Sequence, residues 1–171
     1  MFTNDQLVGL LDQWDVHFLA GSSPPPQTRE MNPEQLLAAL ATSDEARLRL
    51  AIIPFLLRHP EIVVELPVMR EQLPEDAQLV LKCYYTAAHL LQQKYRSRLQ
   101  ALFGHAPLLP NLFGDELGLQ PLQSVDEQLL ALAQSQRTLS GRSLNWLGTY
   151  EHGAQRLLRH YEQKQRWHRS Q

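Results

Sequence analysis

The sequence has one cysteine, Cys83, among its 171 residues, and it has no continuous apolar run of the length that crosses a membrane. A single cysteine excludes an internal disulfide and a cysteine-based metal cluster, so we expect a reducing, cytoplasmic setting. A membrane-spanning helix needs about 20 apolar residues in succession, so we expect no membrane span. The first residues are not basic and precede an amphipathic segment, which is unlike a signal peptide.

The sequence also lacks the short motifs of common enzymes. It contains no Walker loop, no dinucleotide-binding glycine pattern, no Gly-x-Ser-x-Gly and no His-Glu-x-x-His. His152 and His160 lie two helical turns apart, about 12 Å along a helix axis, which is too far for one metal ion. We therefore predict no catalytic residue, no metal ligand and no cofactor, and we favour a protein that is not an enzyme.

One enzymatic alternative stays open. Helical ribonucleases of the HEPN superfamily pair an arginine with a histidine that follows a short distance later, and Arg98 and His105 resemble that loose spacing. However, His105 follows a predicted helix end at Gly104, and Leu99 stands where the family has a polar residue. Arg156 and His160 on the last helix form a similar pair, but they have one intervening residue too few for the pattern.

Charge is distributed unevenly along the chain, although the formal net charge is only −2. Residues 1–81 hold five Lys or Arg and twelve Asp or Glu, which gives −7. Residues 82–171 hold eleven and six, which gives +5. This contrast is compatible with a bipolar surface, with attraction between the two halves, or with a basic half that binds a partner.

Apolar residues recur at helical spacing nearly throughout, which predicts an all-α protein. We expect a single helical bundle, or stacked helical hairpins in the manner of armadillo repeats, around one long central helix. Residues 1–21 are predicted to form an amphipathic helix that we interpret as an arm. Residues 22–31 form a proline-rich linker with three consecutive prolines, and residues 32–171 form the all-helical domain.

Capping signals mark several helix boundaries. Asn32-Pro33 starts a short helix, and Ser124-Val125-Asp126-Glu127 is a capping box. Pro54 falls inside the next apolar pattern and predicts a kink or a break, and a short helix is expected between Pro60 and Pro67. The longest pattern runs from Pro74 to Gly104, which predicts the central helix.

The segment from Gly104 to Pro121 is irregular in pattern but rich in leucine. Such a segment either wraps over the core or presents apolar anchors to a partner, and we favour wrapping. If it presents anchors, Leu112 and Phe113 are the candidates. On the first helix, Trp14 and Phe18 are the corresponding candidates for binding another protein.

The last helix is predicted to begin near Ser140 or Ser143, and its apolar stripe stops at Tyr161. From about Glu162 the helix should project from the body or fray, which leaves Trp167 exposed among basic residues. Trp167 is therefore a further candidate for binding a partner. Basic residues also recur on this helix at every fourth position, namely His152, Arg156, His160, Lys164 and His168.

The basic residues of the second half support two interpretations. An arginine beside an aromatic ring suits nucleic acid, because it offers charge for phosphate and a ring for base stacking. A solvated basic face with a partly disordered end is the simpler alternative. The candidate cations for an anion or nucleic-acid site are Arg96, Arg98, Arg156, Arg159, Lys164 and Arg166.

Three stretches, Leu48 to Pro60, Cys83 to Ala88 and Asn145 to His152, resemble an uncharacterised group of small all-helical bacterial proteins. The resemblance implies a partner or antitoxin-like protein that acts with a nucleotidyltransferase-fold protein. Our leading hypothesis is a non-enzymatic interaction or regulatory protein of the bacterial cytoplasm that binds another protein. Nucleic acid is the alternative partner, and the oligomeric state stays open.

Overall fold

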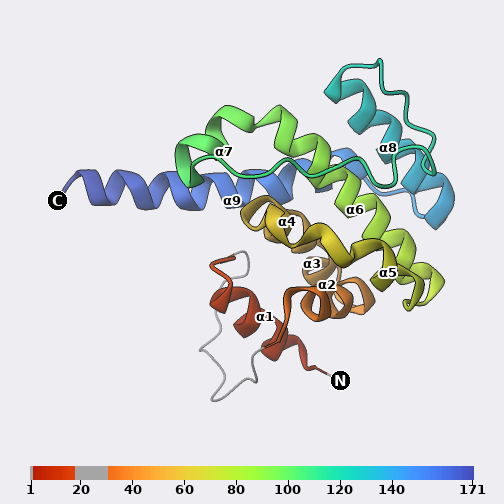
Figure 1. Cartoon of the computed structure of the whole chain (residues 1–171), viewed down its shortest axis with the longest axis horizontal. Helices are drawn as coiled ribbons and strands as arrows, with labels where there is room; N and C mark the ends of the chain where they lie inside the picture. The colour runs from red at the N-terminus through yellow and green to blue at the C-terminus, as the bar shows by residue number, and fades with distance from the viewer. Residues whose placement is uncertain (1, 18–30) are drawn as a thin grey trace.

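The structure is a computed structural model that describes residues 2–17 and 31–171, and in these ranges every regular element is a helix (Figure 1). Phe18 and nearly all of the predicted linker lie outside the described residues. In chain order the elements are α1 (Asn4–Gln13), α2 (Pro33–Thr42), α3 (Ala46–Leu50), α4 (Ile52–Arg58), the 3-10 helix η1 (Pro60–Glu65), α5 (Leu66–Glu71), α6 (Glu75–Lys94), α7 (Arg96–Phe103), α8 (Val125–Ser140) and α9 (Trp146–Arg169).

Helix α6 lies at the centre of the molecule, and α2, α4, α8 and α9 pack against it. A helix that contacts neighbours on several sides needs apolar residues around most of its circumference. Helix α6 meets that requirement. The prediction of an all-α protein built around a long central helix is confirmed, and α6 is that helix. Its buried apolar residues are Ala77, Leu81, Cys83, Tyr84, Tyr85, Ala87, Ala88, Leu90 and Leu91.

The central helix is shorter than the pattern from Pro74 to Gly104 predicted, because the chain breaks at Tyr95 into α6 and α7. No proline or glycine marks the break. Instead, the Tyr95 hydroxyl donates to the Glu151 carboxylate and accepts from the Gln155 amide at 2.9 Å, so contacts with α9 hold the break in place. The predicted helix end at Gly104 is confirmed, and its φ of 75° favours glycine.

The helix that contains Pro54 breaks three residues before the proline, at Ala51, which separates α3 from α4. A proline inside a helix has no N–H for the carbonyl four residues earlier and its ring crowds that carbonyl, which here belongs to Leu50. The predicted short helix between Pro60 and Pro67 is present as η1, and it continues directly into α5.

Helix α1 ends at Gln13, well before the predicted end near Gly21. Asp15 takes a left-handed φ of 57°, and the amide of Val16 turns back to donate to the Leu11 carbonyl at 2.9 Å. The apolar face of α1 packs against α2 and α3, with Leu7, Val8, Leu10 and Leu11 buried. The part of residues 1–21 that the structure describes is therefore packed on the body rather than free as an arm.

The segment from Gly104 to Ser124 runs back along the molecule from α7 to α8, as the thin green and teal trace in Figure 1 shows. The favoured interpretation, that this segment wraps over the core, is confirmed for four buried side chains. Gln92 of α6 fastens the wrap, because its amide donates to the Pro107 carbonyl at 3.0 Å and accepts from the Leu109 amide at 2.8 Å. The buried side chains are Leu109, Phe113, Leu117 and Leu119.

Helix α9 begins at Trp146, after the Asn145 side chain caps the Gly148 amide at 3.0 Å, and not at the predicted serines. Its buried stripe ends at Leu158, and Tyr161 is half-buried. The helix stays regular to Arg169 and extends past the other elements (Figure 1). Of the two predicted alternatives, the end of the helix therefore projects from the body and does not fray. Within residues 2–17 and 31–171, no helix combines the length and apolar character that a membrane crossing needs.

Candidate binding groove

A groove lies between the start of the wrapping segment and two parts of the body, namely the stretch from α4 to α5 and helix α7. One end is a cavity of about 220 Å³ with an apolar base that includes Leu57, Leu99 and Phe103. Its polar lining comes from Arg58, Glu61, Gln92, Arg96, Gln100 and His105. This end can accept a ligand that carries both apolar and polar groups.

The other end of the groove is a shallower apolar hollow of about 380 Å³. Leu108, which is 57% exposed, and Leu112 line this hollow. The two ends share Glu61, Pro107 and Leu108, which makes them one continuous groove. The rest of the apolar lining is the four prolines Pro60, Pro67, Pro107 and Pro110.

Three polar side chains of the lining have no partner in the part of the chain that the structure describes. Arg96 and Gln100 are one turn apart on α7, so they lie on the same face, and His105 follows the end of that helix. Neither a hydrogen bond nor an ion pair joins these side chains to another described residue. They are available to a ligand.

Arg58 connects the groove with the opposite side of α4. Its guanidinium lies over the Phe103 ring at 4.5 Å from the ring centre, and its Nη2 is 3.8 Å from the Asp15 carboxylate. Its Nε is buried and has no hydrogen-bond partner among the described residues. Arg58 therefore lines the cavity and also takes part in the polar contacts around Asp15.

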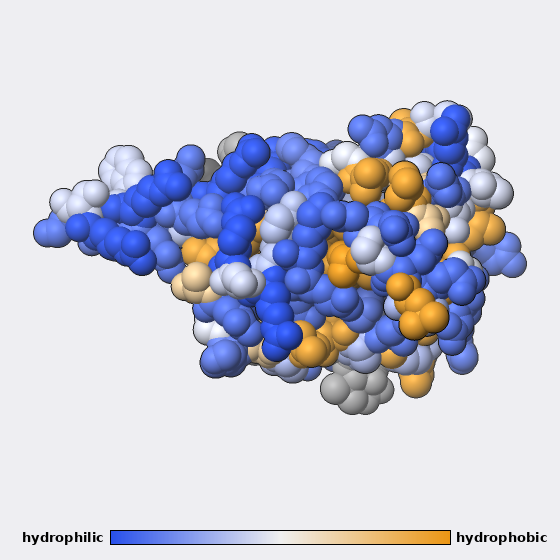
Figure 2. All heavy atoms as spheres, turned by 90° about the horizontal axis from the view of Figure 1, so that it is seen from above, coloured by the Kyte–Doolittle hydropathy of each residue, from blue (hydrophilic) through white to orange (hydrophobic). Residues whose placement is uncertain are grey.

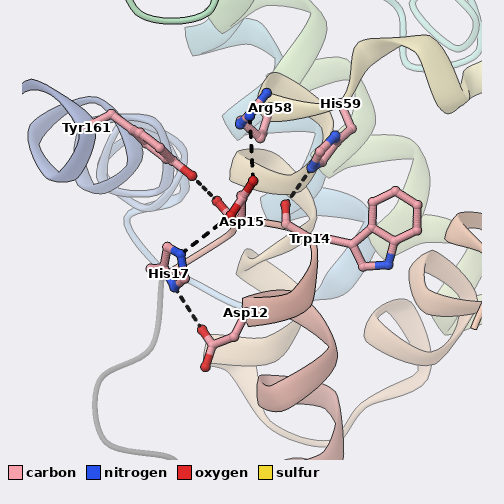
Figure 3. Close-up of polar contacts among 7 residues, drawn as sticks. All are labelled: Asp12, Trp14, Asp15, His17, Arg58, His59 and Tyr161. Atoms are coloured by element: carbon pink, nitrogen blue, oxygen red, sulfur yellow. Dashed lines mark hydrogen bonds and ion pairs between the residues drawn. The ribbon is translucent and has the colours of Figure 1, made fainter. Parts of the chain in front are cut away.

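The turn after α1 is held against α4 and α9 by a cluster of polar contacts (Figure 3). The Trp14 carbonyl accepts from His59 Nε2 at 2.5 Å, and the Asp15 carbonyl accepts from the Tyr161 hydroxyl. Asp12 contacts His17 Nδ1 at 3.2 Å. Because backbone carbonyls accept two of these bonds, the cluster fixes the path of the chain and is a structural latch.

His17 and His160 meet where this latch touches α9, with ring centres 5.2 Å apart. Burial lowers the pKa of His160, and the nearby His17 and Lys164 lower it further. In residues 2–17 and 31–171, no three His, Cys, Asp or Glu side chains converge as metal ligands. Burial also raises the pKa of Cys83 to about 12, so this thiol stays protonated and unreactive.

The structure disperses the predicted partner-binding residues. Trp14 is partly buried and packs edge-on against Phe55, with ring centres 5.9 Å apart. Phe113 is only 2% exposed and packs edge-on against Tyr85, which corrects its assignment as a surface anchor. Leu112 lines the groove, whereas Phe18 lies outside the described residues.

Trp167 is 74% exposed on the projecting end of α9. Figure 2 shows this narrow end of the molecule as hydrophilic, whereas apolar patches gather on the wide body. Lys164 and Arg166 are exposed beside it, and the Lys164 ammonium lies 5.8 Å from the centre of the Tyr161 ring. The predicted basic and aromatic end of the helix is therefore accessible.

Two of the remaining predicted cations, Arg98 and Arg96, are used elsewhere. Arg98 makes a two-point ion pair with Glu162, at 2.8 and 2.9 Å, and so fastens α7 to α9. Arg96 lines the groove instead. Arg156 and Arg159 are exposed along the middle of α9.

The ribonuclease alternative required Arg98 and His105 to face one site. The structure turns Arg98 toward Glu162 on α9, whereas His105 lines the cavity that Arg96 and Gln100 also line. The cavity has two arginines in its wall, but Arg98 is not one of them. The two residues of the motif therefore have different surroundings.

Sequence reasoning missed most of the groove, including Arg58, Gln100 and the four prolines. In the sequence, Pro60 and Pro67 precede the central helix and Pro107 and Pro110 follow it. No local pattern indicated that these two pairs lie together in the folded protein. The chain matches no protein-family model, no curated protein and no solved structure in comparisons with each.

Proposed function

We propose that this protein is a non-enzymatic interaction module that binds a segment of another protein in the groove. The observation that carries the proposal is the continuous groove itself, in which an apolar, proline-lined end adjoins a cavity whose lining includes polar side chains that have no partner among the described residues. Exposed apolar hollows rimmed by polar groups are typical of protein interaction sites.

The lining of the groove suits a peptide segment. Proline rings are fixed in conformation, so a surface built from Pro60, Pro67, Pro107 and Pro110 loses little entropy when a ligand covers it. Leu108 and Leu112 add side chains that adapt to an apolar anchor. Burial of one such anchor contributes about 1.5–3 kcal/mol, and several anchors give a useful affinity.

The resemblance of three stretches to small bacterial helical proteins suggests the first partner to test. In this proposal the protein is a regulatory, antitoxin-like partner in the bacterial cytoplasm, and a nucleotidyltransferase-fold protein supplies the bound segment. The lining of the groove supports binding of a protein segment whichever protein supplies that segment.

The test is the affinity of the partner for variants of the groove, measured by calorimetry after the partner has been captured and purified. Leu108→Asp with Leu112→Asp should weaken binding at least tenfold, because the variant places two charges against the apolar part of the ligand. Leu122→Asp is the matched control, since Leu122 is a fully exposed leucine of the same segment outside the groove. Equal affinity of the double variant and the control would refute the proposal.

A second candidate function is supported by the projecting end of α9, where Trp167 stands exposed among Lys164, Arg166 and Arg169. Cations can neutralise phosphates there, and the indole can stack on a base. Binding of a fluorescent single-stranded oligonucleotide should weaken between 50 and 200 mM salt with a logarithmic slope of about 0.7 for each phosphate contact.

The Trp167→Ala variant separates this candidate from general attraction to a basic surface. Stacking of one base is worth about 1–3 kcal/mol, so Trp167→Ala should weaken oligonucleotide binding by about fivefold or more. Leu144→Ala is the control, because it removes an exposed apolar side chain from the connection before α9. If the oligonucleotide does not bind even at 50 mM salt, nucleic-acid binding is refuted as the second candidate function.

A further inference from the structure

Resting on the proposed function, we infer that the groove selects an acidic-apolar peptide segment, in which Arg96 and His105 bind a carboxylate while the proline-lined end holds an apolar side chain. The shared wall of the two ends at Pro107 and Leu108 allows one short segment to occupy both. A residue in an extended peptide advances about 3.3 Å, so the anchor and the carboxylate lie within a few residues of each other.

The charges of neighbouring residues single out Arg96. Lys94 is 2.6 Å from the Glu151 carboxylate and 2.8 Å from that of Asp126, and Arg98 is paired with Glu162. Lys94 at the end of α6 and Arg98 on α7 thus both pair with acids of α9, whereas Arg96, the first residue of α7, lines the cavity. Arg96 therefore presents to the groove a charge that no described acid neutralises.

The other donors of the cavity reinforce this choice. The Gln100 amide lies one turn from Arg96 on the same face of α7, and His105 has nitrogen atoms that can donate to a carboxylate. Arg58 adds a second guanidinium to the wall of the same cavity. A carboxylate has two oxygen atoms and four acceptor positions, so it can satisfy several of these donors together.

Glu61 sets the direction of the bound segment. It lies at the wall that both ends share, is 56% exposed, and contacts His59 Nδ1 at 3.3 Å. A ligand carboxylate placed there would be repelled, since like charges at close range destabilise a complex. The carboxylate is therefore directed toward the α7 side of the cavity, and an uncharged residue is expected beside the apolar anchor.

The experiment is a selection from a phage-displayed library of random dodecapeptides on immobilised full-length protein. Four forms are compared: the unmodified chain, Arg96→Glu, the double variant Leu108→Asp with Leu112→Asp, and the control Arg137→Glu, which reverses an exposed charge on α8. The unmodified chain and the control should enrich peptides that have an apolar residue with Asp or Glu a few positions away. Arg96→Glu should keep the apolar preference and replace the acid with Lys or Arg.

A synthetic peptide from the consensus then gives the affinity by fluorescence anisotropy. It should bind Arg96→Glu about tenfold more weakly than the unmodified chain, and the peptide whose acid is changed to lysine should reverse that order. An enriched apolar consensus without an acid, or an acid preference that persists in Arg96→Glu, overturns the inference and leaves the proposed function standing. Failure of the unmodified chain to enrich any peptide above the double variant overturns the proposed function as well.

Discussion

Tyr150 of α9 and Gln136 of α8 form a polar contact inside the apolar core. Both side chains are buried, and the tyrosine hydroxyl donates to Gln136 Oε1. Burial raises the pKa of Tyr150 well above its usual value, so the hydroxyl keeps its proton. A buried polar pair of this kind fixes how α8 and α9 meet, because each member depends on the other.

Tyr150→Phe should destabilise the protein by about 1–3 kcal/mol, because it leaves the Gln136 carbonyl oxygen buried without a donor. The measurement is the free energy of unfolding in urea. Adding Gln136→Met to Tyr150→Phe should recover part of the loss, since it removes the orphaned polar group. A double variant that is less stable than Tyr150→Phe alone would contradict this account.

Two histidines should make the stability of the protein depend on pH. His89 Nδ1 donates to the Leu109 carbonyl at 2.7 Å, and burial lowers the pKa of His89 as it does that of His160. Because the pKa values are lower in the folded state, the unfolded chain binds more protons below about pH 6.5. Stability is therefore complete above that pH and is lost as the pH falls through the folded-state pKa values.

Urea unfolding at pH 7.5, 6.5 and 5.5 measures this effect before most carboxylates titrate. The free energy of unfolding should fall from pH 7.5 to pH 5.5, and His89→Gln should reduce the fall because it removes one of the two groups. The control His168→Gln removes an exposed histidine on the projecting end of α9. A pH dependence as steep in His89→Gln as in the control would assign it to other groups.

At the scale of the helices, local signals in the sequence were sufficient where a boundary depends on nearby atoms. The Ser124 and Glu127 capping box, the Asn32 cap and the helix end at Gly104 all appear as predicted. Each depends on a side chain within three residues of the boundary, or on the freedom of glycine to adopt a positive φ.

Boundaries that depend on distant contacts were not predictable. The break at Tyr95 is held by Glu151 and Gln155 on α9, more than 50 positions away in the sequence. The early end of α1 is likewise held by His59 and Tyr161. Helical periodicity continues through both points, so only the folded chain reveals them.

The candidate groove shows the same limit. Leu112 and Arg96 were identified as exposed candidates from the sequence, but in two unrelated proposals. They belong to one groove because the wrapping segment returns past α7 and the end of α4. Gln92, a residue whose amide looks unremarkable in a helical pattern, is one of the α6 side chains that hold this segment in place, together with Tyr85 and His89.

Gln92→Glu should loosen the start of the wrapping segment. A carboxylate keeps an acceptor for the Leu109 amide but cannot donate to the Pro107 carbonyl, and a buried charge adds a further cost. We expect a loss of about 1–3 kcal/mol, with hydrogen exchange in residues 105–111 at least tenfold faster. Gln134→Glu, at an exposed position of α8, is the matched control. Unchanged exchange in residues 105–111 would show that other contacts hold the segment.

At the scale of the whole molecule, the first and the last helical regions of the described chain are in contact. The turn after α1 contacts α9 through the Asp15 carbonyl with the Tyr161 hydroxyl and through the rings of His17 and His160. The more acidic first half of the chain is thereby fastened to the more basic second half. Beyond this contact, α9 leaves the body, so the helix has a packed part and a projecting part (Figure 1).

Deletion of residues 163–171 tests this division of α9. The side chains of residues 163–171 are exposed apart from a half-buried Gln165, so the deletion should change the free energy of unfolding by no more than about 0.5 kcal/mol. Tyr161→Ala should cost about 2–4 kcal/mol, because the ring packs on Phe103 with centres 4.9 Å apart and its hydroxyl holds the Asp15 carbonyl. If the deletion costs as much as Tyr161→Ala, the projecting part is stabilised by contacts of its own. Repeating the comparison over a hundredfold range of protein concentration identifies those contacts, since only an interface between copies makes the cost depend on concentration.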